Sequence, residues 1–311
     1  MLKTLADNLK SQISTKVLNQ EAMTELALVA MFAGGHVLLE GVPGLAKTLW
    51  VRTLANLIKA DFKRIQFTAD LMPSDVIGTK VFNQQKSIFE LKQGPLFTQL
   101  VLADEINRTP PKTQSALLEV MEERSITIDG ETHTMPEPYF VMATQNPIEY
   151  EGTYPLPEAL TDRFMLKILV DYPGVTAEKQ LLQMYHEGFD AMKINYESIC
   201  TSEDIIQAKK EVQAVTVEDG VFNYIVSLVE TTRRVSAVLF GASPRASVAL
   251  LLGAKTYAAI NGRDYVIPDD VRFLAAPVLR HRLIVRPEAE IEGIKPDNVI
   301  ESILSQVKAP R

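Results

Sequence analysis

The sequence has little of what disulfide-bonded, metal-binding and membrane-spanning proteins need. It contains one cysteine, Cys200, so no disulfide can form within the chain, and its four histidines show no metal-ligand spacing. The longest uncharged apolar runs fall well short of the roughly 18 residues that a membrane-spanning helix requires. The charged N-terminal stretch MLKTLADNLKSQIS is not typical of a signal peptide. These features favour a soluble cytoplasmic protein.

Positive charge is not in surplus either. The 311 residues include 32 Lys and Arg against 39 Asp and Glu, which gives a formal net charge of −7. Sequence-independent nucleic-acid binding depends on an excess of cations, so the balance argues against that class and leaves room only for a local basic patch. The length and the 46% hydrophobic content are sufficient for two domains with a core in each.

Apolar segments alternate with helical patterns through the first half of the chain. The strand candidates are residues 36–40, 64–67, 100–104, 139–144 and 165–170. An amphipathic helix is expected from Lys47 to Ile58. Continuous apolar strands separated by helices are typical of a parallel sheet covered on both faces, so the pattern predicts an α/β fold.

Two segments interrupt this alternation, and the second half of the chain differs from the first. Residues 76–95 and 124–135 each have strand-like halves around a polar turn, NQQK or DGE, and predict inserted β-hairpins. After DYPG (171–174) the spacing becomes helical, with Ser, Asp or Pro near several helix starts. We therefore expect an α/β core over 1–175 and a helical domain over 176–311.

The octet GVPGLAKT follows the first strand candidate and precedes a helix, which is the context of a phosphate-binding loop, G-x-x-x-x-G-K-[ST]. Its residues are Gly41, Val42, Pro43, Gly44, Leu45, Ala46, Lys47 and Thr48. Backbone N–H groups of 44–48 would face a β-phosphate, Lys47 would reach the β- and γ-phosphates, and Thr48 would ligate Mg²⁺. On its own the octet could equally be a chance turn.

Ala46 departs from that pattern because it replaces the second glycine. The sixth position of the loop leads into a helix, and alanine enters a helix readily when φ is negative. We therefore expect Ala46 to adopt a right-handed conformation with its N–H facing phosphate.

An acidic pair, Asp104 and Glu105, ends the strand candidate 100–104. A carboxylate at the end of a strand beside a phosphate loop can hold Mg²⁺ through water, and a second one can activate a water for attack on the γ-phosphate. Alone, such a pair could be a solvated strand end. Together with the phosphate loop it favours nucleotide hydrolysis.

Two further residues can complete a hydrolytic site. Asn146 follows the strand candidate 139–144, where its amide can bond a γ-phosphate or the attacking water; a turn-forming asparagine before Pro147 is the structural alternative. Arg245 lies in the first turn of a helix in the second domain and can reach a phosphate across the interdomain cleft. A surface arginine near a helix cap is the alternative for Arg245.

These motifs, in this order, resemble AAA+ ATPases. The spellings LEGVPGLAKT, LMPSDVIGT, LADEINRTPPKTQSALLEVMEE, ATQNPIEYEGTYPLPEALTDRF and GASPRA resemble the MoxR family, over a region from Val17 to Arg286. MoxR proteins commonly carry alanine at the position of Ala46. The resemblance implies a P-loop NTPase αβα core with a parallel sheet, a helix-2 insert at 76–95, a pre-sensor-1 hairpin at 124–135 and a C-terminal all-helical lid.

The resemblance also implies roles for individual residues. Residues 41–48 would be Walker A, and Asp104 and Glu105 Walker B, with Glu105 as catalytic base. Asn146 would be sensor 1 and Arg245 sensor 2.

Other positions match family segments that contact the base or a neighbouring subunit. Asn19 and Gln20 match the segment whose backbone lies against adenine. Arg163 matches an arginine finger that reaches the nucleotide of the adjacent subunit, although the spelling EALTDRF here departs from the more usual EAQLDRF, including at Thr161. Arg108 and Arg124 lie in family-like blocks, and the sequence does not decide which of the three arginines acts most across the interface.

The function implied is hydrolysis of ATP with Mg²⁺ by a homo-oligomeric ring, expected to be a hexamer. MoxR-type proteins resemble chaperone-like machines that mature or activate other complexes, often with a partner carrying a von Willebrand factor type A domain; metal insertion is one such role.

A magnesium-chelatase-type subunit shares the same ATPase chemistry and is the first alternative. A nucleic-acid motor or loader is disfavoured by the acidic balance, and a non-hydrolysing nucleotide-binding scaffold by Glu105, Asn146 and Arg245.

Overall fold

The computed structural model describes residues 1–42, 44–146, 152–191 and 193–310, and at its centre lies a five-stranded sheet. The strands are β1 (Val37–Glu40), β2 (Phe62–Gln66), β5 (Leu100–Asp104), β8 (Phe140–Gln145) and β9 (Leu166–Leu169), in the order β2-β5-β8-β1-β9. Every neighbouring pair is parallel. The predicted α/β fold and its five strand candidates are confirmed, with strand ends within two residues of those expected.

The sheet is buried on both faces because alternate residues of each strand point to opposite sides. Val37 and Leu39 of β1 belong to one hydrophobic cluster, with α1 (Leu2–Ser14), α2 (Glu21–Ala33) and α3 (Lys47–Leu57). Leu38 of β1 belongs to a second cluster on the other face, with α4 (Pro73–Ile77) and α5 (Pro111–Glu123). This two-sided burial explains why the strands read as continuous apolar runs.

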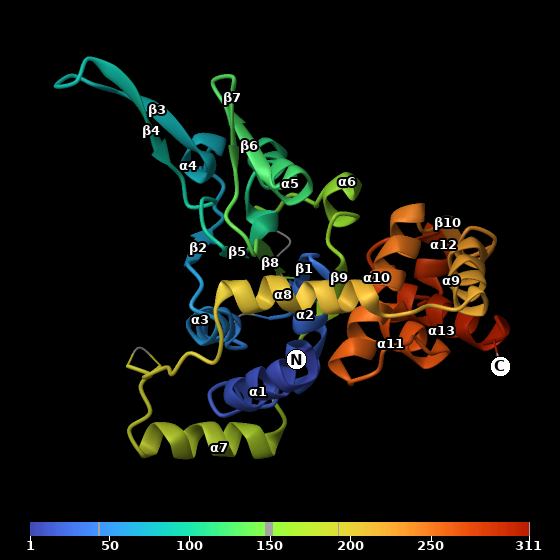
Figure 1. The fold of residues 1–311 in the computed structure, drawn as a ribbon. Helices are drawn as coiled ribbons and strands as arrows, with labels where there is room; N and C mark the ends of the chain where they lie inside the picture. The colour runs from blue at the N-terminus through green and yellow to red at the C-terminus, as the bar shows by residue number, and fades with distance from the viewer. Residues whose placement is uncertain (43, 147–151, 192, 311) are drawn as a thin grey trace.

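Both predicted hairpins are present as antiparallel pairs. The first pairs β3 (Gly78–Asn83) with β4 (Ile88–Gln93), and the second pairs β6 (Ser125–Ile128) with β7 (Glu131–Thr134). They project from the same side of the sheet (Figure 1), and an ion pair of 2.9 Å between Lys80 and Glu131 joins them.

The remainder of the chain is mostly helical, as predicted. Its helices are α7 (Val175–His186), α8 (Ser202–Ala214), α9 (Asp219–Thr232), α10 (Pro244–Ile260), α11 (Pro268–Leu279), α12 (Pro287–Ile291) and α13 (Pro296–Gln306). Helices α9 to α13 gather at one end of the molecule, whereas α7 lies apart from them (Figure 1). A small antiparallel sheet of β10 (Val238–Phe240) and β11 (Ile284–Val285) interrupts the expected all-helical lid.

One hydrophobic cluster continues from the core into the C-terminal helices. Helix α10 packs against α1 and α2, and Leu250 shares a cluster with Leu9 and Leu28. The division at about residue 175 therefore stays a prediction. Within the described ranges, no helix combines the length and apolarity that crossing a membrane would require.

Candidate functional site

A cleft of about 470 Å³ opens at the carboxyl edge of the parallel sheet. Because β1, β5 and β8 are neighbours or next neighbours in a parallel sheet, the segments that follow them meet at this edge. Of the predicted site residues, the cleft is lined by Gly41, Gly44, Leu45, Ala46, Lys47, Thr48, Asp104, Glu105 and Asn146. The structure thus brings the phosphate loop, the acidic pair and the amide together. Val42 packs against the adjoining core, and Pro43 lies outside the described residues.

The loop is built on two left-handed residues. Gly44 has φ +87° and Ala46 has φ +56°, ψ 19°. The expectation of a right-handed Ala46 is therefore wrong. Helix α3 begins at Lys47, as predicted, and Ala46 is its N-cap, a position whose backbone need not be helical. Left-handed residues in such a turn direct successive N–H groups into a concave anion site.

Gly41 and Lys47 close this loop. A Cβ built at Gly41 would lie 2.5 Å from the carbonyl oxygen of Val170, so no larger residue fits beside that strand end. Lys47 Nζ donates a 2.8 Å hydrogen bond to the Gly41 carbonyl. Burial lowers the pKa of Lys47, and the charges of Asp104 and Glu105 oppose that shift. A dianionic phosphate in the cleft would supply a further counter-charge.

Asp104 is held by two side chains from neighbouring strands. Thr144 Oγ1 donates a 2.6 Å hydrogen bond to Asp104 Oδ1. Arg64 donates to the other oxygen, Oδ2, through Nε at 3.0 Å and Nη2 at 2.7 Å. This carboxylate is consequently fixed in orientation at the end of β5.

Glu105 has a left-handed backbone, with φ +56° and ψ 49°. Its N–H donates to Thr144 Oγ1 at 2.8 Å, and its Oε2 accepts from Gln66 at 2.7 Å and from Arg108 at 2.9 Å. Non-glycine residues in this conformation cost about 1–3 kcal/mol and are concentrated at functional sites. The hydrogen bonds on both sides of the residue hold the carboxylate over the cleft.

The donors present fit a magnesium ion. The hydroxyl of Thr48 and the carboxylate of Asp104 line the same cleft, and Mg²⁺ prefers hard oxygen ligands together with water and phosphate oxygens. Asn146, which is 7% exposed, follows β8 on the same wall. It is therefore placed where an amide can contact a phosphate or a water.

Several cleft residues were not found by sequence reasoning. Arg64, Gln66 and Thr144 contact the acidic pair, and their detection requires the register that sets Gln66 beside Asp104. Leu181, Tyr185 and Phe189 form an apolar wall contributed by α7 and the turn after it. These three residues recur at intervals of four, and this spacing was the signal for them in the sequence. Amphipathic spacing alone, however, predicts packing against other parts of the protein and not a ligand site.

Asn19 and Gln20 do not line this cleft. Asn19 is exposed with φ +55°, and Gln20 is 8% exposed and lines a separate cavity of about 480 Å³ between α1 and α2. Their contact with adenine stays a prediction.

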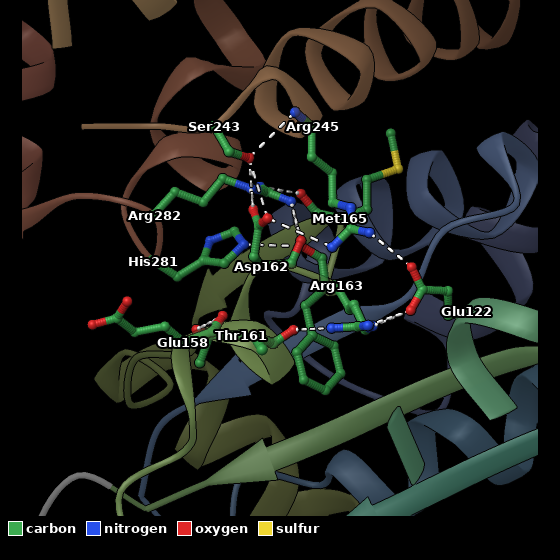
Figure 2. A network of polar contacts seen from close by, with 12 residues as sticks. Glu122, Glu158, Thr161, Asp162, Arg163, Met165, Ser243, Arg245, His281 and Arg282 are labelled. Atoms are coloured by element: carbon green, nitrogen blue, oxygen red, sulfur yellow. Dashed lines mark hydrogen bonds and ion pairs between the residues drawn. The ribbon is translucent and has the colours of Figure 1, made fainter. Parts of the chain in front are cut away.

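Arg245 does not line the phosphate cleft in this structure, and its role as sensor 2 stays a prediction. Its side chain is directed to Glu122 and Asp162, beside Arg163, and neither arginine lines the phosphate cleft (Figure 2). The reason is the packing of α10, which sets Arg245 against the end of α5 and the loop after α6 (Glu158–Thr161).

The other two arginines are placed differently. Arg108 contacts Glu105 of its own chain, at the edge of the cleft. Arg124 donates a 3.1 Å hydrogen bond to the Gly34 carbonyl and forms an ion pair of 3.7 Å with Glu137. Of the three candidates for an arginine finger, Arg163 is therefore the one that shares a surface with Arg245.

Comparison with known proteins agrees with this arrangement. Residues 36–166 match the family described as "ATPase family associated with various cellular activities (AAA)", and residues 230–303 match the AAA lid domain. The chain is 51% identical over 285 residues to the uncharacterised YeaC of Bacillus subtilis (strain 168), which covers 92% of this chain and 88% of that protein. It is 43% identical over 309 residues to Chaperone MoxR1 of Mycobacterium tuberculosis (strain ATCC 25618 / H37Rv), with coverage of 96% and 81%.

A solved structure is similar as well. A candidate ATPase from Cytophaga hutchinsonii ATCC 33406 superposes with a TM-score of 0.92 at 43% identity, over 100% of this chain and 96% of that one. With the family match in the core, the lid match and the extended similarity to MoxR1, the chain belongs to the MoxR family of AAA+ ATPases.

Proposed function

We propose that this protein hydrolyses ATP to ADP and phosphate with Mg²⁺, as a ring whose subunits complete one another's sites. The observation that carries the proposal is the convergence of a phosphate loop, Asp104, Glu105 and Asn146 on one cleft. These groups supply phosphate binding, metal binding, water activation and water positioning, which together suffice for phosphoryl transfer to water.

Each residue has a distinct task in this scheme. The N–H groups of 44–48 and Lys47 would bind the β- and γ-phosphates, and Thr48 and Asp104 would hold a magnesium ion, which would supply positive charge against the phosphates. Glu105 accepts the proton of the attacking water, which Asn146 orients. The hydrogen bonds from Gln66 and Arg108 hold the Glu105 carboxylate for this step.

The position of Arg163 and Arg245 outside the cleft supports a ring. Arg163 and Arg245 lie together on another surface of the same subunit. Charge that develops on the γ-phosphoryl group is commonly stabilised by an arginine from a neighbour. A head-to-tail contact would carry this surface to the next subunit's cleft, and repetition of that contact closes a ring, expected to be hexameric.

The biological output proposed is that of a chaperone-like machine that matures or activates other protein complexes. The similarity to Chaperone MoxR1 supports this class. A partner with a von Willebrand factor type A domain, a cytoplasmic location and metal insertion into a client are the finer parts of the proposal. They follow from the family resemblance.

The test compares Glu105→Gln with wild type and with Lys47→Ala. Glu105→Gln should bind ATP with unchanged affinity and lose at least about 100-fold in turnover, because only the base is removed. Lys47→Ala should lose nucleotide binding. Phosphate release and binding of a fluorescent ATP analogue measure the two properties. Wild-type turnover by Glu105→Gln would refute the assignment of the base.

The chaperone class is tested with the same variants. Glu105→Gln loaded with ATP should retain a specific protein that Lys47→Ala does not, since a blocked turnover prolongs the client-bound state. Identical sets of co-purified proteins would count against a nucleotide-controlled client cycle.

A further inference from the structure

A single carboxylate contacts both arginines of the proposed intersubunit surface. Glu122, at the end of α5, accepts from Arg245 Nη2 through Oε1 at 3.0 Å. Its Oε2 accepts from Arg163 Nε at 2.9 Å and also from Arg163 Nη2. Figure 2 shows Glu122 beside the two side chains, with one carboxylate oxygen directed to each arginine.

The positive charges of Arg163 and Arg245 require a carboxylate such as Glu122 beside them. Two guanidinium ions that converge from α10 and from the loop after α6 would repel each other without an anion between them. The pKa of Glu122 lies below its usual range, first because of its hydrogen bond with Arg163. The carboxylate is thus ionised at neutral pH, and the three side chains together keep one net positive charge.

Both arginines retain donors for a ligand. Each guanidinium has five N–H groups. Arg163 uses three nitrogens, with Glu122 and the carbonyl of Ala159 as acceptors, and Arg245 uses one nitrogen with Glu122 and another toward Asp162 at 3.6 Å. The side chain of Arg245 is 43% exposed and that of Arg163 is 19% exposed. A phosphate can therefore be bound without displacing Glu122.

The backbone beneath Arg163 is fixed independently of Glu122. Arg282, whose side chain is 2% exposed, donates to Asp162 Oδ1 at 2.7 Å and to the carbonyls of Asp162 and Phe164 at 2.9 and 2.8 Å. The residues on both sides of Arg163 are held in this way. The Arg163 side chain itself is oriented by Glu122 and the carbonyl of Ala159.

We propose that Glu122 is a positioning residue that holds Arg163 and Arg245 as one two-arginine unit for the nucleotide of a neighbouring subunit. The inference rests on the proposed ring mechanism. Its own content is that Glu122, which bonds both arginines, is required to align them together toward that nucleotide, although Glu122 itself touches no nucleotide.

The test uses Glu122→Gln and Glu122→Ala, with Glu123→Gln as the matched control one residue along α5, where the glutamate is exposed. Glutamine keeps the shape of the glutamate side chain but carries no charge and has a single acceptor oxygen. We expect both Glu122 variants to assemble normally and to lose about tenfold or more in kcat, with the KM for ATP within about twofold of wild type. Glu123→Gln should retain wild-type values for both constants.

A mixing experiment separates positioning from a merely structural role. A Glu122→Ala subunit keeps an intact phosphate cleft, and a Glu105→Gln subunit keeps intact arginines. In a mixture, activity should return at interfaces where the cleft of a Glu122→Ala subunit meets the arginines of a Glu105→Gln subunit. A misfolded variant would not be rescued.

The outcomes distinguish this inference from the mechanism beneath it. Wild-type or increased kcat in Glu122→Gln, while Arg163→Ala and Arg245→Ala lose activity, would overturn the role of Glu122 alone. If Arg163→Ala and Arg245→Ala also hydrolyse ATP like wild type, the ring mechanism fails and the inference fails with it.

Discussion

Residue 46 combines an alanine with a left-handed backbone, φ +56°, directly before the first helical residue of α3. A left-handed conformation costs an L-residue roughly 1–2 kcal/mol that glycine does not pay. Ala46→Gly should therefore raise the free energy of unfolding by about 0.5–1 kcal/mol, after allowance for the greater freedom of glycine in the unfolded chain. Urea unfolding of the nucleotide-free protein measures this gain.

The control for that prediction is the same substitution at Ala22, an exposed residue in the first turn of α2. There the backbone is right-handed, and glycine should lower stability by about 0.5–1 kcal/mol. Equal destabilisation at both positions would contradict the argument from backbone conformation.

His36 provides a pH dependence at the residue scale. It is 4% exposed, accepts from the Val141 N–H at 3.1 Å through Nδ1, and contacts the Met121 carbonyl through Nε2. Burial, followed by the charges of Arg124 and Lys209, lowers its pKa from 6.5 to about 4. As the pH falls, His36 is therefore protonated at a higher pH in the unfolded chain than in the folded protein. The stability that the neutral ring contributes is complete above pH 6.5 and is lost as pH drops toward 4.

His36→Gln keeps a donor and an acceptor but does not titrate. The difference in unfolding free energy between pH 7.5 and 4.5 should shrink by up to about 3 kcal/mol relative to wild type. Exposed His186 at the end of α7 supplies the control, because His186→Gln should leave that difference unchanged. An unaltered pH dependence in His36→Gln would disprove the linkage.

At the scale of elements, the pair Asp162–Arg282 joins the loop between α6 and β9 to the turn that follows α11. Removing one partner of a buried, hydrogen-bonded ion pair typically costs about 3–5 kcal/mol, and we expect the low end, about 3 kcal/mol, because Asp162 is 27% exposed and keeps Arg245 and Ser243 as partners. Arg282→Met should lower the free energy of unfolding by that amount in urea titrations. Arg286→Met, at an exposed arginine, should cost less than about 1 kcal/mol. Similar losses for the two variants would show that Arg282 has no special anchoring role.

The elements also show what a sequence pattern can predict. β1 and β8 were predictable because continuous apolar runs are required wherever both faces of a strand are covered. The pair β10–β11 was not predictable, since three- and two-residue strands carry no period of their own. The left-handed backbone of Ala46 was not predictable for another reason: the sequence placed Ala46 directly before the helix, and the backbone of an N-cap residue need not be helical.

At the scale of the whole molecule, the phosphate cleft and the arginine surface differ in predictability. Asp104 ends β5 and Asn146 directly follows the neighbouring parallel strand β8, so their proximity follows from strand order and local sequence. The position of Arg245 depends on how α10 packs on α1 and α2, which is set by contacts between distant segments. A motif can identify such a residue without indicating which subunit's nucleotide it faces.

The separation of these two surfaces leads to a prediction about mixed assemblies. Arg163→Ala keeps an intact cleft and Glu105→Gln keeps intact arginines, so each variant alone should lose hydrolysis while it still binds ATP. In an equal mixture that exchanges subunits, about a quarter of the head-to-tail interfaces would join the two intact halves, and activity should rise toward that fraction of wild type. Phosphate release after mixing measures the recovery.

The control is a mixture of Arg163→Ala with the double variant Glu105→Gln/Arg163→Ala, which has no complementary interface and should remain inactive. Recovery in that control, or none in the first mixture, would mean that Arg163 does not act on the nucleotide of a neighbour.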